Sequence, residues 1–535
     1  MRWLSALVAL VALSGPGPAR GADLGLQPPR RDGRRVVAIL PPVTENEDAR
    51  QLALLVQARA SALLVESGAY HDVHIKMITS MAERDGIPLG ALDEPEHALH
   101  AGRRLGASRV VHAILVPNGG DGAWGGWTLR ATTRRSLKDF RRASITLPGD
   151  FSRLVAEGGL ALAEMVFRAD GLPVPPSLRV RALATESHDA TRAFARCYAH
   201  VIEQPFRIGK AIVLSKKQLD DAARACEEAV KDDPGYAEAW AALGLVRTVA
   251  GEDARAIEAL GKVPATAGYV PLYWLARYWL VVRYQSNDAG TRVLRSAIDR
   301  LPGFLLARGY LAQHLTTIRQ YPAALDAWRA YREINPESAY VLGQMSHVLS
   351  HLGKKDEAID EARRAVALDA DSRDAAVELG SRYIDAGRWK DAITTLARVA
   401  ARPPVRPETL LRLGYAHLGA GDLNAAEGEL ERARKTATSR KEWRTRARAA
   451  VDLAAIALRR GKADAARVLL EAAAAEGLDV AAVAAYDPTL AKLAKSLPVG
   501  QRPSEASPFA LDAHGDADPN AARRSPPPGF GALKM

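Results

Sequence analysis

A 34-residue spacing recurs between residues 203 and 440, and it constrains the fold more than any other feature of the sequence. Prolines stand one or two periods apart, at Pro234, Pro302, Pro336 and Pro404. Glycines form a second series of the same period, at Gly251, Gly353, Gly387 and Gly421. Small residues form a third series, at Ala222, Ala256, Gly290, Ala324, Ala358, Ala392 and Ala426. Three series in phase predict helix–turn–helix units that stack into a solenoid.

The residues of these units resemble the tetratricopeptide pattern. When the units are counted from 237, 271, 305, 339, 373 and 407, position 4 is bulky at Trp240, Trp274, Leu342 and Leu410. Arg308 and Ala376 depart from the pattern at that position. The small residue at position 20 lets two helices cross closely, and proline at position 32 ends the second helix. The resemblance implies a mainly α fold, a solenoid of about 7–8 helix pairs over residues 187–496.

Residues 35–170 have a different pattern, which predicts a small α/β domain. Apolar strands are expected at 35–40 and 110–116, and alternation at 73–77 indicates another strand. Helical spacing is found at 47–67, 94–105 and 150–167, and strands 127–133 and 144–147 suit a hairpin. The predicted order βαβαβββα gives a mixed sheet with helices packed on it.

This domain resembles the amino-terminal α/β domain of the translocation protein TolB and its relatives, in which it often precedes tetratricopeptide repeats. The resemblance is carried by three phrases: VVAILPPV at 36–43, HALHAGRRLGASRVVHAILV at 97–116 and LVAEGGLALAEMV at 154–166. No catalytic motif defines that domain, so the resemblance implies no reaction.

The remaining segments are interpreted from their composition. Residues 1–22 combine Arg2, an apolar run at 4–13 and small residues after it, which predicts a cleaved signal peptide and a periplasmic protein with no membrane span after cleavage. Residues 23–34 suit a flexible leader, and the proline-rich stretch at 171–186 a linker. Residues 497–535 are rich in Pro, Ser and Gly, which indicates a disordered tail.

Export bears on the two cysteines, Cys197 and Cys226. An oxidising compartment permits a disulfide between them, although two buried thiols in a helical core remain the alternative. Sequence spacing cannot show whether the two side chains point toward each other.

Motifs for chemistry are scarce. Gly120-Asp-Gly122-Ala-Trp-Gly125 has the spacing of a dinucleotide fingerprint, but a strand follows it, so we expect a hairpin turn and no cofactor. The His71/His74 and His97/His100 pairs could reach a metal, yet helical spacing leaves His97 and His100 solvated. We therefore expect no catalytic residues and no metal; a metal-dependent enzyme using these pairs is the low-ranked alternative.

The formal net charge of +11 suits an acidic partner, but basic and acidic residues alternate along the repeats, so we expect no nucleic acid partner. The concave groove, to which positions 2, 5, 9, 12 and 13 of each unit point in the family, is the predicted binding site. Its residues here are Leu275, Trp279, Arg283, Gln313, Tyr340, His347, His351, Asp385 and Tyr415. Apolar anchors with a few polar groups suit a peptide or helix of a protein partner.

Besides the low-ranked enzyme, two binding functions therefore remain open at this level. The first is a non-enzymatic protein–protein interaction scaffold of the bacterial cell envelope. The alternative is a glycan- or peptidoglycan-associated binding protein, which an aromatic groove permits.

Overall fold

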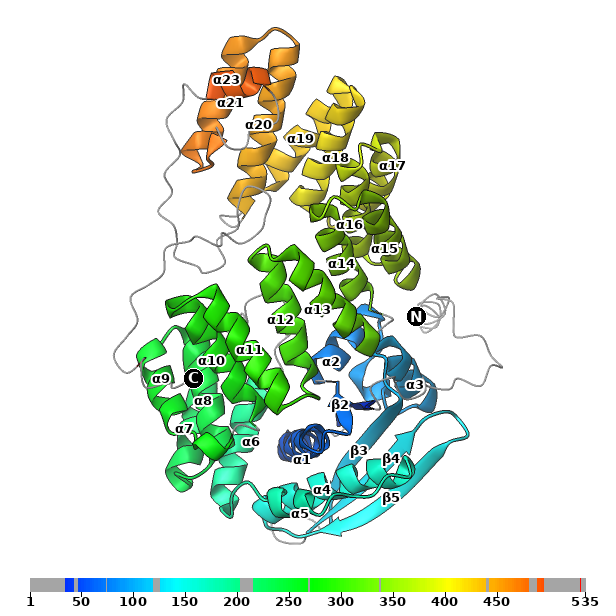
Figure 1. Ribbon diagram of the computed structural model, residues 1–535, viewed down its shortest axis with the longest axis vertical. Helices are drawn as coiled ribbons and strands as arrows, with labels where there is room; N and C mark the ends of the chain where they lie inside the picture. Colours follow the sequence, from blue (N-terminus) through cyan, green and yellow to red (C-terminus); the bar gives the residue numbers. More distant parts are fainter. Residues whose placement is uncertain are drawn as a thin grey trace, which may run out of the picture.

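The protein is a long helical solenoid with a small α/β domain packed against its first half (Figure 1). The computed structural model describes residues 34–42, 47–73, 75–118, 126–202, 215–267, 270–335, 338–438, 442–480, 488–494 and 530. The predicted signal peptide lies outside these residues, as does the predicted leader except for Arg34. Among the described residues, no helix has the length and apolar character that crossing a bilayer requires.

The α/β domain is built on a mixed five-stranded sheet of order β2-β1-β3-β4-β5. Its strands are β1 (Arg35–Ile39), β2 (Tyr70–Asp72), β3 (Arg109–Pro117), β4 (Trp127–Arg134) and β5 (Phe140–Leu147). Strand β1 runs parallel to β2 and β3, whereas β3, β4 and β5 are antiparallel neighbours. The predicted mixed sheet is confirmed.

Alternating residues of the strands face two helical layers, because successive side chains of a strand point to opposite faces. Val37 and Ile39 pack in one core with α1 (Glu47–Glu66) and α4 (Phe151–Ala169). Val36 and Ala38 pack in a second core beside α2 (Ile75–Arg84) and α3 (Pro95–Arg104). The helices expected at 47–67, 94–105 and 150–167 are therefore present.

The strand expected at 73–77 is wrong, since β2 ends at Asp72 and α2 begins at Ile75. Only the three residues of β2 pair with β1, and Val73 donates the last backbone hydrogen bond, to Val37 at 3.0 Å. The buried residues after that point are Ile78, Met81 and Ala82, whose spacing of three and one suits a helix face. The short apolar alternation at 73–77 overlaps with this helical pattern. The segment forms a helix because Ile78, Met81 and Ala82 can then pack together in the core.

Eight helix pairs follow in the described residues, which confirms the predicted solenoid of about 7–8 pairs (Figure 1). The pairs are α6 (His188–Ile202) with α7 (Lys216–Asp232), α8 (Ala237–Ala250) with α9 (Asp253–Gly261), α10 (Pro271–Tyr284) with α11 (Asn287–Arg300), α12 (Leu305–Thr317) with α13 (Tyr321–Ile334), α14 (Ala339–His351) with α15 (Lys355–Leu368), α16 (Arg373–Asp385) with α17 (Trp389–Ala400), α18 (Pro407–Ala420) with α19 (Leu423–Thr436), and α20 (Trp443–Arg459) with α21 (Ala463–Ala475). A short helix, α23 (Pro488–Ala494), packs on the last pair.

The glycine and small-residue series have separate structural reasons. The periodic glycines lie in the left-handed region after the first helix of their units, as at Gly251 with φ 79° and Gly421 with φ 85°, where a side chain would be strained. Ala324 and Ala392, on second helices, are 0% exposed. At Gly290 an added Cβ would lie 2.4 Å from Val282, so that helix crossing leaves no room for a side chain.

The segment predicted as a linker is part of the fold. Its helix α5 (Ser177–Arg181) buries Leu178, which is 1% exposed and belongs to the core shared by the α/β domain and the first repeats. The segment 171–186 therefore contributes to the packed core as well as joining the two domains. Of the predicted tail only Phe530 is described; it is 6% exposed, and its ring centroid lies 5.5 Å from that of Tyr284. At that residue, the tail packs on the solenoid.

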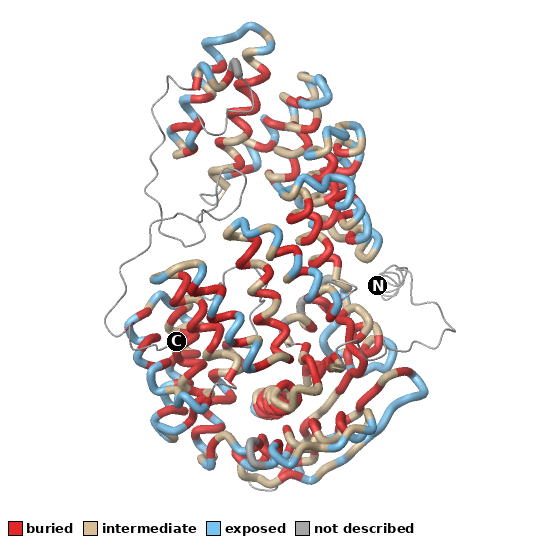
Figure 2. Tube along the Cα trace, in the orientation of Figure 1, coloured by how far each residue is buried: buried red, intermediate tan, exposed pale blue. Residues whose placement is uncertain are grey.

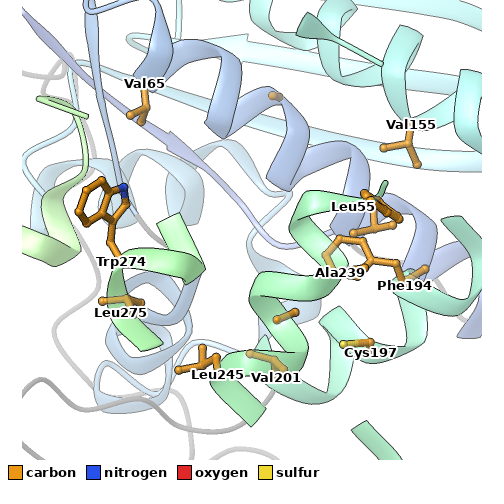
Figure 3. Close-up of a cluster of buried hydrophobic side chains, with 14 of the residues drawn as sticks. Leu55, Val65, Val155, Phe194, Cys197, Val201, Ala239, Leu245, Trp274 and Leu275 are labelled. Carbon is orange, nitrogen blue, oxygen red and sulfur yellow. The ribbon is translucent and has the colours of Figure 1, made fainter. Parts of the chain in front are cut away.

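Cys197 on α6 and Cys226 on α7 are joined by a disulfide, with their Cα atoms 5.2 Å apart. Both residues are 0% exposed, so the bond lies inside the first helix pair (Figure 3 shows Cys197). The structure thus adopts the bridged alternative of the two that the sequence left open.

Candidate binding groove

The first half of the solenoid curves around helix α1 of the α/β domain. Figure 1 shows α1 end-on, between α4 on one side and the repeat helices on the other, and Figure 2 colours much of this helix as buried. Position-2 residues of three successive repeats, Glu238, Leu272 and Leu306, border one cavity together with Leu54 and Leu55 of α1. The concave face of these repeats therefore already holds a helix, and that helix belongs to the same chain.

Helix α1 is suited to this position because it has little polar surface. The six consecutive residues 52–57 are all buried, so every side of the helix is covered there. A helix that is apolar all round is expected inside a structure rather than on its surface. The run Leu52-Ala-Leu-Leu-Val56 was the sequence signal for this arrangement, which our sequence interpretation missed.

One buried ion pair joins α1 to the repeats. Arg59 Nη2 donates to Glu238 Oε1 at 2.7 Å, and the two side chains are 8% and 14% exposed. Gly159 of α4 approaches Arg59 so closely that an added Cβ would lie 2.5 Å from its Cγ. Helix α4 thus presses the Arg59 stem toward the solenoid, which orients the guanidinium.

Further contacts extend along the solenoid. Strand β2 continues into a parallel bridge between Asp72 and Phe304, and the Asp72 amide donates to Gly303 O at 3.3 Å. A Cβ at Gly303 would lie 2.2 Å from Tyr70 O, so glycine allows the two backbones to approach. Farther along, Arg104 Nη1 donates to Leu368 O, the last residue of α15, at 3.0 Å. The α/β domain therefore spans the first five helix pairs.

The predicted groove residues of the first half serve mainly in packing. Leu275 is 5% exposed in the core that includes α1 residues (Figure 3). Trp279 packs on Tyr278 and Tyr310, with ring centroids 5.4 and 5.9 Å away. Arg283 forms an ion pair with Asp253 of α9. These side chains pack neighbouring repeats together, and Trp279 and Arg283 stay partly exposed.

Two predicted residues at the middle of the solenoid connect neighbouring repeats. Tyr340 Oη donates to Gln313 Oε1 at 3.1 Å, and its ring lies 5.9 Å from that of Trp328, which is 0% exposed. Burial raises the pKa of the Tyr340 hydroxyl, so it stays protonated as a donor near neutral pH. Tyr340 therefore packs against the core between neighbouring repeats while staying partly exposed.

The second half of the groove begins with a cluster of rings on α13 and α14. His351 is exposed and stacks on Tyr321, with ring centroids 4.5 Å apart. His347, one turn earlier and partly exposed, lies edge-on to His351 at 4.6 Å. The two imidazoles are accessible rather than enclosed in a core.

Beyond α14 the groove is more polar. Asp385 of α16 accepts from Ser350 Oγ at 2.7 Å and faces Arg382 at 3.4 Å. Tyr415 of α18 is partly exposed, 6.4 Å from the ring of Trp389, and its pKa is raised by burial and by the charge of Asp452. Figure 1 shows α16 to α21 extending beyond the α/β domain, so this half carries the groove residues still accessible to a partner.

The histidine pairs do not form a metal centre among the described residues. His74 lies outside them, and His71 is 0% exposed on β2. His100 Nε2 is 2.7 Å from Asp85 Oδ2, and His97 Nδ1 is 3.1 Å from Ala91 O, so the two rings have separate partners. No group of three metal-ligand residues occurs in the part of the chain that the structure describes. The residues 120–125 lie outside that part.

Comparisons with known proteins concern the solenoid. Residues 213–278 match one model of the tetratricopeptide repeat, and residues 344–404 and 377–442 match a second. The chain is 22% identical over 230 residues to the peroxisomal targeting signal receptor of Kluyveromyces lactis, covering 36% of this chain and 40% of that receptor. The receptor of the same name from Eremothecium gossypii is 24% identical over 234 residues, with 40% and 38% covered. The chain thus spans less than half the length of either relative.

Among solved structures, a tetratricopeptide repeat protein from Parabacteroides merdae is 12% identical, covers 58% of this chain over its full length and has a TM-score of 0.37. YrrB, described as a tetratricopeptide repeat protein with an unusual peptide-binding site, is 17% identical, covers 39% of this chain over its full length and has a TM-score of 0.28. The resemblance of residues 35–170 to the TolB domain stays a prediction. The helix pairs within residues 213–278 and 344–442 are tetratricopeptide repeats.

Proposed function

We propose that this protein is a non-enzymatic interaction scaffold whose second half, α14 to α21, binds a segment of a protein partner. The observation that carries the proposal is the seating of α1 against the inner face of the first repeats, where Arg59 and Glu238 fix it. This supports a concave face suited to a helix that presents a broad apolar surface and pairs one charged side chain, here Arg59, with the repeats. Tetratricopeptide repeats are protein-interaction modules, and helix-in-groove binding is one of their physical options.

The chemistry of the open half differs from that of the occupied half. His347, His351 and Tyr415 offer rings, while Asp385 offers a carboxylate that is 40% exposed. Glu378, 27% exposed, lies beside it against Arg382. A partner with an apolar face and one or two basic side chains would match this surface, because cations can pair with these carboxylates and stack on the rings.

We also propose export to a bacterial periplasm, which rests on the sequence of residues 1–22. The Cys197–Cys226 bond supports this proposal, since disulfides persist mainly in oxidising compartments. Glycan or peptidoglycan remains the alternative occupant of the groove. Among the described residues, no polar arrangement specific to a sugar favours this alternative.

The test is capture of partners from a native extract by the full chain and by a His351→Ala/Tyr415→Ala variant. We expect at least a tenfold loss of the proteins captured by the native chain, because ring anchors carry about 2 kcal/mol or more of such contacts. The melting temperature should change little, since both side chains are partly or fully exposed.

A Val468→Ala variant is the control, because Val468 is a 64% exposed apolar residue on α21. It should capture the same proteins as the native chain. Undiminished capture by the double variant would move the binding site away from the groove. Export is tested by mass spectrometry of the chain purified from the same cells, which should lack residues 1–22. A chain that still has these residues would contradict cleavage of a signal peptide.

A further inference from the structure

A cavity of about 120 Å³ lies where α1 and β2 meet the inner helices of the first repeats. Most of its wall is apolar, with Leu55 and Val65 of α1 opposite Phe194 of α6 and Leu272 of α10. Figure 3 shows Leu55 and Phe194 side by side, with Val65 farther along the same helix. A cavity of roughly this size with apolar walls can hold a six-membered ring.

Three residues of the cavity wall each have a buried acceptor oxygen with no hydrogen-bond partner among the described residues: Gln57 Oε1, Asp72 Oδ1 and Glu238 Oε2. Gln57 is 6% exposed, and its amide nitrogen is already bound to Ile39 O. Buried acceptors of this kind nearly always have a donor, because leaving one unsatisfied costs about 1–3 kcal/mol. The residues of this wall therefore carry acceptor oxygens that no donor of the described residues reaches.

The charged groups of the cavity wall also favour a ligand that donates hydrogen bonds. Arg59 neutralises Glu238 through the 2.7 Å ion pair, which leaves Asp72 as the remaining carboxyl group on the wall. Burial raises the pKa of Asp72 to about 7, partly offset by a hydrogen bond from Ser61. The charge of Asp72 in turn adds to the burial that raises the pKa of the Tyr198 hydroxyl, another residue of the wall. Near neutral pH, this carboxyl group can therefore accept a cation or a donor.

We propose that the cavity binds a small primary amine with an apolar body of about eight heavy atoms, its ammonium group at Asp72. An ammonium group has three donors, and it would satisfy the Asp72 carboxylate while the ring fills the apolar wall. The proposal does not depend on partner binding in the second half of the groove.

The position of the cavity gives the ligand a structural effect. Leu55, Gln57 and Asp72 belong to the α/β domain, whereas Phe194, Glu238 and Leu272 belong to the repeats. A bound amine would contact both, so it should hold α1 and β2 against the solenoid and raise the melting temperature in proportion to its occupancy.

The probes are benzylamine, benzyl alcohol and benzoate, titrated into the full chain at pH 8 by calorimetry. We expect benzylamine to bind with a dissociation constant on the order of 1 mM, as its eight heavy atoms permit. Benzyl alcohol, which has the same shape without the charge, should bind about tenfold more weakly. Benzoate should not bind measurably, because its carboxylate would face the acceptor oxygens.

Two variants locate the site. Asp72→Asn should reduce benzylamine affinity at least tenfold while leaving benzyl alcohol affinity within about threefold, which also shows that the cavity is intact. Leu272→Phe should weaken both probes by filling the wall. Asp360→Asn is the matched control, because Asp360 is a 66% exposed carboxylate on α15. It should change neither affinity.

The proposal is overturned if benzylamine fails to bind at 20-fold the expected dissociation constant, about 20 mM. Equal affinity for benzylamine and benzyl alcohol would overturn it too, and so would an Asp72→Asn variant that binds benzylamine like the native chain. If Asp72→Asn does not fold, Glu238→Gln takes its place: it leaves the positive charge of Arg59 unpaired on the same wall, so benzylamine should lose affinity relative to benzyl alcohol. An unchanged ratio of the two affinities would overturn the proposal.

Discussion

At the scale of single residues, the junction of the two domains is held by a few groups that are expensive to leave unsatisfied. Arg59 and Glu238 are 179 residues apart in the sequence and form a largely buried pair. Gly303 lets β2 continue onto the repeat backbone, because any side chain there would collide with Tyr70 O. Asp72 sits between these features, with its backbone bridged to Phe304.

Asp72 makes the stability of the protein depend on pH. Its folded-state pKa of about 7 lies above the ordinary value of 3.8, so the folded state keeps a proton that the unfolded state releases. The free-energy cost of ionising Asp72 in the folded protein is absent below pH 4, grows as pH rises between about 4 and 7, and is complete above pH 7. Asp72→Asn should therefore stabilise the free protein by roughly 1–2 kcal/mol at pH 8.

The measurement is denaturant unfolding of Asp72→Asn and native chains at pH 4.5, 6 and 8. The advantage of the variant should shrink toward pH 4.5, where the native carboxyl group is protonated in the fold. An advantage that is equal at all three values would show that Asp72 does not titrate in this range. Asp360→Asn serves as the control for a carboxylate lost from the surface.

At the scale of elements, each repeat depends on one close crossing between its two helices. Ala324 on α13 is 0% exposed, and on the same helix Trp328 Nε1 donates to Thr316 Oγ1 of α12 at 3.0 Å. The series of small residues therefore marks where paired helices approach, as the sequence pattern implied. Ser346 Oγ, which donates to Ala358 O at 2.8 Å, ties the next pair in the same way.

Ala324→Phe should destabilise the protein by more than about 2 kcal/mol, because overpacking this crossing forces the two helices apart. Ala330→Phe is the matched control, since Ala330 is exposed on the same helix. Its effect should stay within about 0.5 kcal/mol. Thermal or urea unfolding of both variants is the measurement, and equal curves would mean that α12 and α13 do not cross at Ala324.

At the scale of the whole molecule, the two halves of the solenoid differ in how they are supported. Core residues of α1 to α4 join those of the repeats as far as α15 in two shared clusters. The cluster of α17 to α23 contains no residue of the α/β domain. The first half is therefore stabilised by contacts that are distant in sequence, whereas the second half depends on neighbouring repeats.

Hydrogen exchange should reveal this difference. We expect backbone amides of α18 to α21 to exchange at least tenfold faster than those of α8 to α13, because fewer long-range contacts oppose local opening. Glu238→Gln should speed exchange in α1 and α8 together. Glu228→Gln, a 56% exposed neighbour on α7, should not do so. Equal amide exchange rates along the whole solenoid would contradict the inference that the α/β domain stabilises only its first half.

The sequence by itself determined the repeat architecture, because every unit packs on its neighbours and the required small residues, glycines and prolines recur at a fixed spacing. It also indicated a mixed sheet, since strand and helix periods are local properties. It did not place the start of α2, where alternation at 73–77 and helical spacing overlapped. The disulfide was left open because Cys197 and Cys226 lie on different helices, and sequence spacing does not say how two helices are placed relative to each other.

Only the tertiary structure decided which part of the groove is accessible. Of the predicted residues in the first half, Leu275 is buried in the core that includes α1, and Trp279 and Arg283 pack on adjacent repeats. His351, Asp385 and Tyr415 lie beyond that half. Arg59 of α1 is 179 residues from Glu238 of α8, and no local pattern specifies which apolar surface will cover α1. The cavity at Asp72 follows from that same docking, because its walls come from segments that meet only when the chain has folded.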